Sequence, residues 1–416
     1  MKRINFRAAL AAFVLLAPAS HSADARVPAD SETSGPILTA DNTLTPMRFG
    51  ATGDRSADDT AALNAMYVAA RKTTAIVFLR GGQYRVTGQI DARGVRTIGE
   101  GATLNFELDS STSPNAFLWG GSNTFVTQVN FRLANSGAAT MQGVLNPVND
   151  VRNERFYGNR VECVTTDKSN LKSNIFGVWV TGTGVNGLYI NDNEFESCTY
   201  GVQINSQNGM QQNVRTNPLG KPSSHIHISD NTFVDATLGV NTPHILVSDV
   251  VIAGNTIEPK ILRLDLPLNV AHVSRLAITG NTVTSNASSA NGTLHVEDAS
   301  GAVTITGNVI TVKGKNNGIQ VGVRPSVSHD QAPTGRVVIS GNHVEGPGGS
   351  IADTAGIIMP DGSGTIDTTV SGNYIADFAQ CVNSVERSNV SWNTLVRCPV
   401  PVKSVKSPMY SNMINE

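Results

Sequence analysis

The chain has 416 residues, of which 40% are hydrophobic and 15% charged, and its formal net charge is −2. A chain this apolar can bury a large core, which excludes an intrinsically disordered protein. The slightly acidic balance offers no electrostatic basis for binding nucleic acid, so we expect no nucleic-acid partner.

Residues 1–23 have the pattern of a signal peptide. Lys2, Arg3 and Arg7 precede the apolar run AALAAFVLLA, and small residues suited to cleavage follow. The run is too short to span a membrane, and no other stretch approaches the required length. We expect a secreted or periplasmic protein with no membrane span, whose net charge after cleavage is −5. Residues 24–44 would be a linker. The alternative for the N-terminal run is a buried helix.

The segment after this linker is expected to cover the N-terminal end of a sheet domain, because an open sheet edge invites aggregation. Ser56-Ala57-Asp58-Asp59 resembles a capping box and would open a helix over residues 58–71. Helical periodicity places three apolar residues of this helix on its inner side: Leu63, Met66 and Ala70. The runs AIVFL, QYRV and RTIG then begin the strands.

This opening segment resembles a known family. MRFGATGDRSADDTAALNAMYVAA, followed by AIVFLRGGQYRV and VRTIGEGATL, is similar to the start of pectate lyase superfamily proteins. More narrowly, it resembles the rhamnogalacturonase/epimerase-like pectate lyase domains. The resemblance covers residues 47–106 in its motifs and residues 150–400 only in repeat style. It implies a right-handed parallel β-helix, a polysaccharide substrate, and a structural role for Asp54, Asp58 and Asp59.

The resemblance assigns no catalytic residue. The Asn-Thr-Asp, Gly-His-Gly and Arg-Ile-Lys motifs of polygalacturonase-type hydrolases are absent, as is the Asp-Pro-His-Asp motif of mannuronan epimerases. The only Asp-Asp pair, Asp58-Asp59, belongs to the predicted cover. The superfamily includes lyases, hydrolases, epimerases and non-catalytic phage spikes, so the reaction must be argued from the residues themselves.

A short β-branched run that ends in asparagine recurs along the chain, as in VTITGN at residues 303–308. Nine asparagines end these runs at steps of 20 to 38 residues: Asn159, Asn193, Asn231, Asn255, Asn281, Asn308, Asn342, Asn373 and Asn393. A repeat of this length predicts a solenoid. Stacked coils lie about 4.8 Å apart, so an inward amide on each coil can donate to one neighbour and accept from the other.

We therefore predict an all-β fold, a right-handed single-stranded parallel β-helix over residues 45–405 with a capping helix at its N-terminal end. Residues 406–416 would form a short terminal strand and tail. The alternative, a β-sandwich with asparagine-rich turns, leaves the recurrence of one motif at one place unexplained.

Four cysteines fit an oxidising compartment. Cys163 and Cys198 follow two repeat asparagines by similar offsets, which would stack them on adjacent coils. Cys381 and Cys398 flank the last repeat asparagine. We predict the disulfides Cys163–Cys198 and Cys381–Cys398, with free buried thiols as the alternative. No Cys/His spacing resembles a zinc site.

Sites on such solenoids are expected on the outer face of one sheet, in a groove walled by loops. Alternation in the strand after each asparagine turn puts one set of residues inside: Val178, Val202, Val270, Val296 and Val321. The outward column then reads Trp179, Gln203, Leu246, Asn269, His295, Gln320, Ile358 and Asn383. The next outward column includes Asn205 and Glu297. Insertions at 206–225 and 325–335 would form the groove walls.

The candidate catalytic residues are His295, Glu297 and Arg324. Elimination next to a uronate carboxylate needs a cation to neutralise that carboxylate and a base to remove the adjacent proton. Arg324 is the predicted cation and His295 the predicted base, while Glu297 would orient the histidine or bind Ca²⁺. Stacking and hydrogen bonds to sugar rings are expected from Trp179, Gln203, Asn205, Asn269 and Gln320.

Hydrolysis would instead need two carboxylates about 5–9.5 Å apart across the scissile bond. The nearest outward neighbours of Glu297 are amides or small residues, which favours a lyase acting on an acidic polysaccharide. A glycoside hydrolase of the same fold and a non-catalytic carbohydrate-binding or surface protein are the alternatives. Both a monomer and a trimer are compatible with the sequence.

Overall fold

The computed structural model describes residues 42–108, 115–135, 143–165, 175–204, 220–241, 247–259, 266–288, 291–297, 299–322, 335–359, 367–384, 388–404 and 409–415. All of them lie in one compact unit that begins at Asn42. Residues 1–23 and nearly all of the 24–44 segment fall outside them, so the signal peptide and linker stay predictions. In this part of the chain, no helix is long and apolar enough to cross a membrane.

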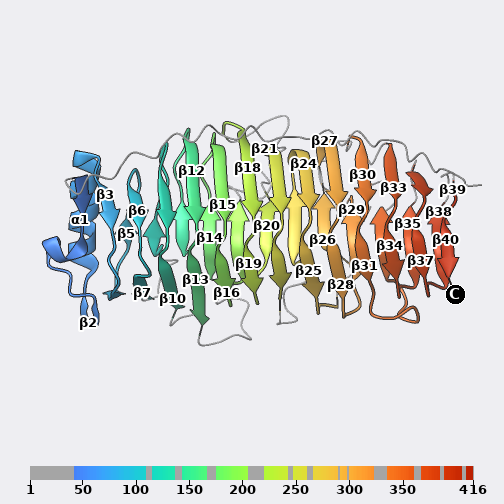
Figure 1. Ribbon diagram of the computed structural model, residues 1–416, viewed down its shortest axis with the longest axis horizontal. Helices are drawn as coiled ribbons and strands as arrows, with labels where there is room; N and C mark the ends of the chain where they lie inside the picture. Colours follow the sequence, from blue (N-terminus) through green and yellow to red (C-terminus); the bar gives the residue numbers. More distant parts are fainter. Residues whose placement is uncertain are drawn as a thin grey trace, which may run out of the picture. The chain divides into compact units, whose positions relative to one another are not determined.

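Three sheets make up the unit, and successive rungs follow one another from blue to red in Figure 1. In the first, sheet A, the described strands are β1 (Thr43–Leu44), β3 (Ile76–Phe78), β6 (Arg96–Ile98), β9 (Phe125–Thr127), β12 (Arg152–Tyr157), β15 (Asn186–Asn191), β18 (Ser223–Ser229), β21 (Val247–Ala253), β24 (Val273–Thr279), β27 (Ser300–Thr306), β30 (Val337–Ser340), β33 (Thr368–Ser371), β36 (Ser388–Ser391) and β39 (Met409–Tyr410).

Sheet B consists of β2 (Asp54–Asp58), β4 (Gln83–Val86), β7 (Thr103–Leu108), β10 (Asn130–Asn135), β13 (Arg160–Thr165), β16 (Glu194–Glu196), β19 (Thr232–Val234), β22 (Thr256–Glu258), β25 (Thr282–Ser285), β28 (Val309–Val312), β31 (His343–Glu345), β34 (Tyr374–Ala376), β37 (Thr394–Val396) and β40 (Met413–Asn415). Sheet C consists of β5 (Ile90–Asp91), β8 (Phe117–Leu118), β11 (Val144–Asn146), β14 (Phe176–Val180), β17 (Tyr200–Ile204), β20 (Leu238–Asn241), β23 (Leu268–Ala271), β26 (Gly292–Glu297), β29 (Asn317–Val321), β32 (Ala355–Met359), β35 (Gln380–Ser384) and β38 (Val400–Ser404).

Each strand from β6 to β37 pairs in parallel with the strand three numbers before it and the strand three numbers after it, as β15 does with β12 and β18. One turn of the chain therefore adds one strand to every sheet, which confirms the predicted parallel β-helix. The last rung includes β39 and β40, which lie within residues 406–416 and pair with β36 and β37.

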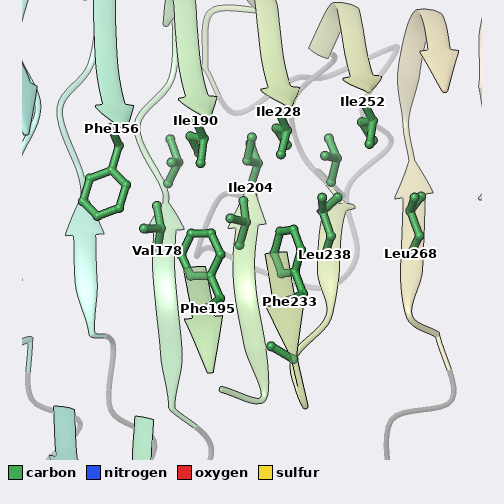
Figure 2. Packing of buried hydrophobic residues seen from close by; sticks show 14 of the residues in the cluster. Phe156, Val178, Ile190, Phe195, Ile204, Ile228, Phe233, Leu238, Ile252 and Leu268 are labelled. Carbon is green, nitrogen blue, oxygen red and sulfur yellow. The ribbon is translucent and has the colours of Figure 1, made fainter. Parts of the chain in front are cut away.

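The core is the inside of the coil. Alternating side chains from all three sheets meet there, and Figure 2 shows Phe156, Ile190 and Ile228 in line on successive rungs with Phe195 and Phe233 nearby. The five valines predicted to face inward from sheet C are each no more than 1% exposed. Like residues stack on like because the register holds from rung to rung, which suits the packing of β-branched and aromatic side chains.

The asparagine ladder is confirmed. Each of the nine predicted asparagines donates from Nδ2 to the Oδ1 of the asparagine on the next rung, over 2.9 to 3.1 Å. The same Oδ1 also accepts the backbone N–H of the preceding asparagine, as Asn281 does for Asn255 at 2.9 Å. A tenth asparagine, Asn412, accepts from Asn393 and is the last described member of the ladder. It was not predicted, because its own run, "MYSN", lacks β-branched residues.

Helix α1 (Thr60–Thr73) follows the short 3-10 helix η2 (Pro46–Phe49) and lies at the N-terminal end of the coil (Figure 1). Its inner face is as predicted, since Leu63, Met66 and Ala70 are buried. The helix therefore covers the first rungs, where an open core would otherwise meet water.

The predicted capping box is wrong. Ser56 lies in β2, and Asp59, at the N-cap position, makes no side-chain bond to the helix. Its Oδ1 instead accepts the backbone N–H of Thr52 at 2.7 Å, while Asp58 Oδ1 accepts that of Thr60 at 3.1 Å. These carboxylates hold the loop before α1 in place, which agrees with the structural role that the resemblance implied.

Both predicted disulfides are confirmed. Cys163 is bonded to Cys198, and Cys381 to Cys398. The first joins residues 35 apart and the second residues 17 apart, so each bridge ties neighbouring turns of the coil together.

Candidate functional site

The outer face of sheet C brings several predicted site residues into one row. Trp179 pairs with Gln203, and further along the sheet Asn269 pairs with His295, which pairs with Gln320. Strict parallel register puts these side chains one rung apart, on the face away from the core. The sequence therefore predicted the order of this column correctly for its described members.

One rung of the predicted column is wrong. The rung between Gln203 and Asn269 is supplied by Gly239 of β20, not by Leu246. The run around Leu246 was expected to supply this rung, but its residues 247–249 begin β21 in sheet A. Leu246 itself lies outside the described residues. Both runs alternate apolar and polar residues, so periodicity alone could not decide which of them belongs to which sheet. Glycine leaves this rung without a side chain.

The column is buried, although an exposed row was expected. The exposed fractions are 9% for Trp179, 5% for Gln203, 5% for His295 and 1% for Gln320, while Asn269 is half-buried. Buried polar side chains need hydrogen-bond partners, so their arrangement is set by the contacts they make rather than by solvent.

His295 and Gln320 contact each other through Nε2 atoms 3.2 Å apart. The orientation of the Gln320 amide follows from its other contacts: Oε1 accepts from Asn317 Nδ2 at 3.5 Å, and Nε2 donates to the carbonyl of Gly322 at 3.4 Å. In this orientation the Gln320 amide donates to Nε2 of His295, and Nε2 accepts in the tautomer that carries its proton on Nδ1.

An aromatic group lies beside the polar part of this column. The ring of Phe176 stacks on Trp179, with centroids 4.3 Å apart, and on Tyr200, with centroids 5.0 Å apart. Trp179 also packs with Leu118 and Leu145 in a small apolar cluster separate from the main core. Aromatic faces next to amides are the usual lining of a sugar-binding surface.

Glu297, the last residue of β26, is half-buried and pairs in register with Ala271, whose own partner is Asn241. The two rungs before Glu297 therefore place no carboxylate in its row. Arg324 and Asn205 lie outside the described residues, as do most of the two insertions expected to wall the groove. Where the chain is described, no group of three or more His, Cys, Asp or Glu side chains could hold a metal ion, so calcium gains no support there.

Sequence reasoning missed two features. A cavity of about 360 Å³ lies on the outer face of sheet A, lined in part by His225 and His227. The alternating histidines of SSHIHIS were its only signal. Glu154 is fully buried and accepts from Gly121 N at 2.5 Å and Asn146 Nδ2 at 2.9 Å. Burial raises its pKa to about 7 despite these two bonds.

The family model described as rhamnogalacturonase A/epimerase, pectate lyase-like, matches residues 47–260, more than half of the chain. The chain belongs to this family. The match begins in the segment around α1 and extends through the rungs up to β22, so it includes Trp179 and Gln203 but ends before His295.

Solved structures of the same architecture are similar to this family member. PfbA, a surface adhesin of Streptococcus pneumoniae, is 12% identical with a TM-score of 0.51 over 89% of this chain and 90% of that one. The Agl-KA catalytic domain is 12% identical with a TM-score of 0.51, over 91% of this chain and 69% of that one.

A tailspike protein of E. coli bacteriophage HK620, solved in complex with a pentasaccharide, is 14% identical with a TM-score of 0.51 over 89% and 65% of the two chains. At these identities the likeness shows the fold alone. No curated protein matches the sequence.

Proposed function

We propose that this protein is an exported lyase that holds an acidic polysaccharide across the outer face of sheet C and cleaves it by β-elimination. Membership of a pectate lyase-like family supports a polysaccharide as the substrate. The two disulfides support export, because disulfides persist in oxidising compartments. The stacked rings of Phe176, Trp179 and Tyr200, together with Gln203 and Asn269, would bind the sugar rings.

The observation that carries the reaction is the contact between His295 and Gln320. A base must present a lone pair, and an amide donor at Nε2 favours the His295 tautomer in which Nε2 carries one. A bound sugar would displace this amide, and Nε2 would remove the proton from the carbon beside the uronate carboxylate. The electron pair forms a carbon–carbon double bond, the glycosidic carbon–oxygen bond breaks, and water supplies the proton for the leaving oxygen.

Neutralisation of the uronate carboxylate stays assigned to Arg324, as predicted from the sequence. Glu297 would orient the substrate or His295. A hydrolase is less well supported, since the two rungs before Glu297 have Ala271 and Asn241 in its row, and neither can act as the second carboxylate.

The test is a screen of polygalacturonate, alginate and glucuronate-containing polysaccharides, followed by the ultraviolet absorbance of the unsaturated product. The wild type should produce it on at least one polymer, and His295→Ala should lose at least about a hundredfold in rate, the usual contribution of a general base. His343→Ala, on the half-exposed surface of β31, is the matched control and should keep full activity. Equal rates for the two variants would remove His295 from the mechanism, and a saturated product would identify a hydrolase.

A second function, carbohydrate binding without turnover, is favoured by one observation: His295 is only 5% exposed, with Nε2 engaged by Gln320. A protein of this kind would bind the same polymers and release no product from any of them. The screen therefore separates the two functions when binding and product are measured on the same samples.

A further inference from the structure

The cavity on sheet A is produced by a step in a row of stacked side chains. Arg155, Tyr189 and His227 are register partners on successive strands, and the row continues with Val251 and Ala277. The Arg155 guanidinium lies over the Tyr189 ring at 5.3 Å, and the Tyr189 and His227 rings are stacked with centroids 5.0 Å apart. Beyond His227 the row has the small side chains of Val251 and Ala277. The series of stacked side chains therefore ends at His227, and the space above the smaller side chains is the cavity.

The cavity has an apolar floor, an aromatic end wall and a polar side wall. Val251 and Ala277 form the floor, and the far face of the His227 ring forms the end wall. The side wall contains Asp249, whose two carboxylate oxygens accept from Arg275 Nε at 2.6 Å and Nη2 at 2.7 Å. Its volume of about 360 Å³ falls within the range of small-ligand sites.

The side wall keeps an unfavourable backbone. His225, Asp249 and Arg275 have φ values of 57°, 56° and 59°, in the left-handed region that non-glycine residues seldom adopt. Other rungs of the same row have positive φ too, at Asn153, Gly187 and Gly301. The conformation is therefore a bend that the coil repeats, and it sets the side chains of His225, Asp249 and Arg275 in one line beside the cavity.

Two charged side chains line the cavity, the cation Arg275 and the anion Asp249, and they are paired with each other. Arg275 Nη1 takes no part in either of these two bonds. Burial, and secondarily the nearby His225, lower the pKa of His227, so its ring is uncharged at neutral pH. An uncharged ring face next to a guanidinium and a carboxylate suits a ligand with an apolar face and an edge of hydroxyl and carboxylate groups.

We propose that this cavity is a second polysaccharide-binding site, separate from sheet C, that takes one pyranose ring of an acidic sugar chain. The C–H face of the sugar would pack on His227 and the Val251–Ala277 floor. Its hydroxyls would donate to Asp249, and its carboxylate would accept from Arg275. The inference rests on the proposed function only in taking the polymer to be acidic.

The test is calorimetric titration of the His295→Ala protein, which prevents turnover, with short oligogalacturonides, oligomannuronates and glucuronate-containing oligomers. Cello-oligosaccharides of equal length are the neutral comparison. Two binding sites are expected for an acidic oligomer. Adding Ala277→Phe fills the cavity and should remove one site, whereas adding Val338→Phe places the same ring on the same row beyond the cavity and should leave both.

His227→Ala, which removes the stacking surface without filling the cavity, should weaken the same site about fivefold. Thermal unfolding of each variant checks the fold. One site in the starting protein and none after Ala277→Phe would support the cavity and contradict binding on sheet C. Identical binding by the Ala277→Phe and Val338→Phe proteins, no binding of any acidic oligomer, or equal binding of cello-oligosaccharides would overturn the proposal.

Discussion

Asn281 and Asn269 are both side-chain amides at register positions of the coil, but their surroundings are opposite. Asn281, in the turn between sheets A and B, is fully buried, and its Oδ1 accepts both the backbone N–H and the Nδ2 of Asn255. Asn269, on the outer face of sheet C, has a buried Oδ1 that meets no hydrogen-bond donor among the described residues. Oδ1 of Asn281 is therefore hydrogen-bonded by another asparagine of the same ladder. Oδ1 of Asn269 has no such repeated partner among the described residues.

This difference distinguishes rung positions that stabilise the coil from rung positions that are available to bind a ligand. A rung position occupied by the same residue on every turn completes its hydrogen bonds internally and stabilises the coil. A rung position whose residue changes from Trp179 to Gln203 to His295 cannot do so, and it presents a different group at each rung. We therefore expect substitutions in the ladder to affect stability, and substitutions in the column to affect binding.

The largest effect is expected from Asn281→Ala. The change leaves the backbone N–H and the Nδ2 of Asn255 without their common acceptor inside the turn, and each unsatisfied buried donor costs about 1–3 kcal/mol. The free energy of unfolding should fall by about 3 kcal/mol. Denaturant titration followed by circular dichroism measures it.

Asn389→Ala is the matched control, because Asn389 is an exposed asparagine on β36. Its effect should stay within about 0.5 kcal/mol. If both variants were equally stable, the ladder would not be the stabilising feature that its geometry indicates.

The second-largest effect on stability is expected at Glu154, a buried carboxyl group that accepts from the side-chain amide of Asn146. The pKa of Glu154 is raised from 4.5 to about 7 by burial. Between these values the folded state holds a proton that the unfolded state has released, so the contribution of Glu154 to stability is greatest below pH 4.5 and falls as the pH rises to about 7. The loss amounts to about 3 kcal/mol. Glu154→Gln should abolish this part of the pH dependence, as measured by unfolding at a series of pH values.

Exposed carboxylates also titrate in this range, and Glu258→Gln, at an exposed position of β22, provides the comparison. That variant should keep the wild-type slope between pH 4.5 and 7. A Glu154→Gln protein with an unchanged slope would mean that the buried carboxyl group is not the source.

The fold could be predicted from the sequence because its determinants repeat. Nine asparagines and the alternation around them specified the ladder, the inward valines and both disulfide pairs. Asn412 escaped because its run lacks β-branched residues, and the capping box failed because Asp59 bonds to Thr52 rather than to the helix. Local motifs are ambiguous where tertiary partners compete for the same side chain.

The candidate site was predictable only in part. Alternation gave the order of the column on sheet C, but not its burial, since burial depends on what lies over the sheet. The contact between His295 and Gln320 joins residues 25 apart and follows from register, which depends on loop lengths. The sheet A cavity arises from small side chains that follow large ones across rungs, a pattern that is not visible along the chain.

The smallest effect on stability is expected from Asn269→Leu. Because Oδ1 of Asn269 is buried without a described donor, an apolar side chain of similar size should leave the free energy of unfolding unchanged within about 0.5 kcal/mol, or raise it. The same change removes an amide from the proposed substrate face, so polysaccharide binding should weaken about tenfold, as expected for the loss of one well-placed hydrogen bond. Unfolding and binding measured on one preparation test both halves. A loss of stability as large as that of Asn281→Ala would show that the outer column is part of the structural framework, and the division between ladder and column would then be wrong.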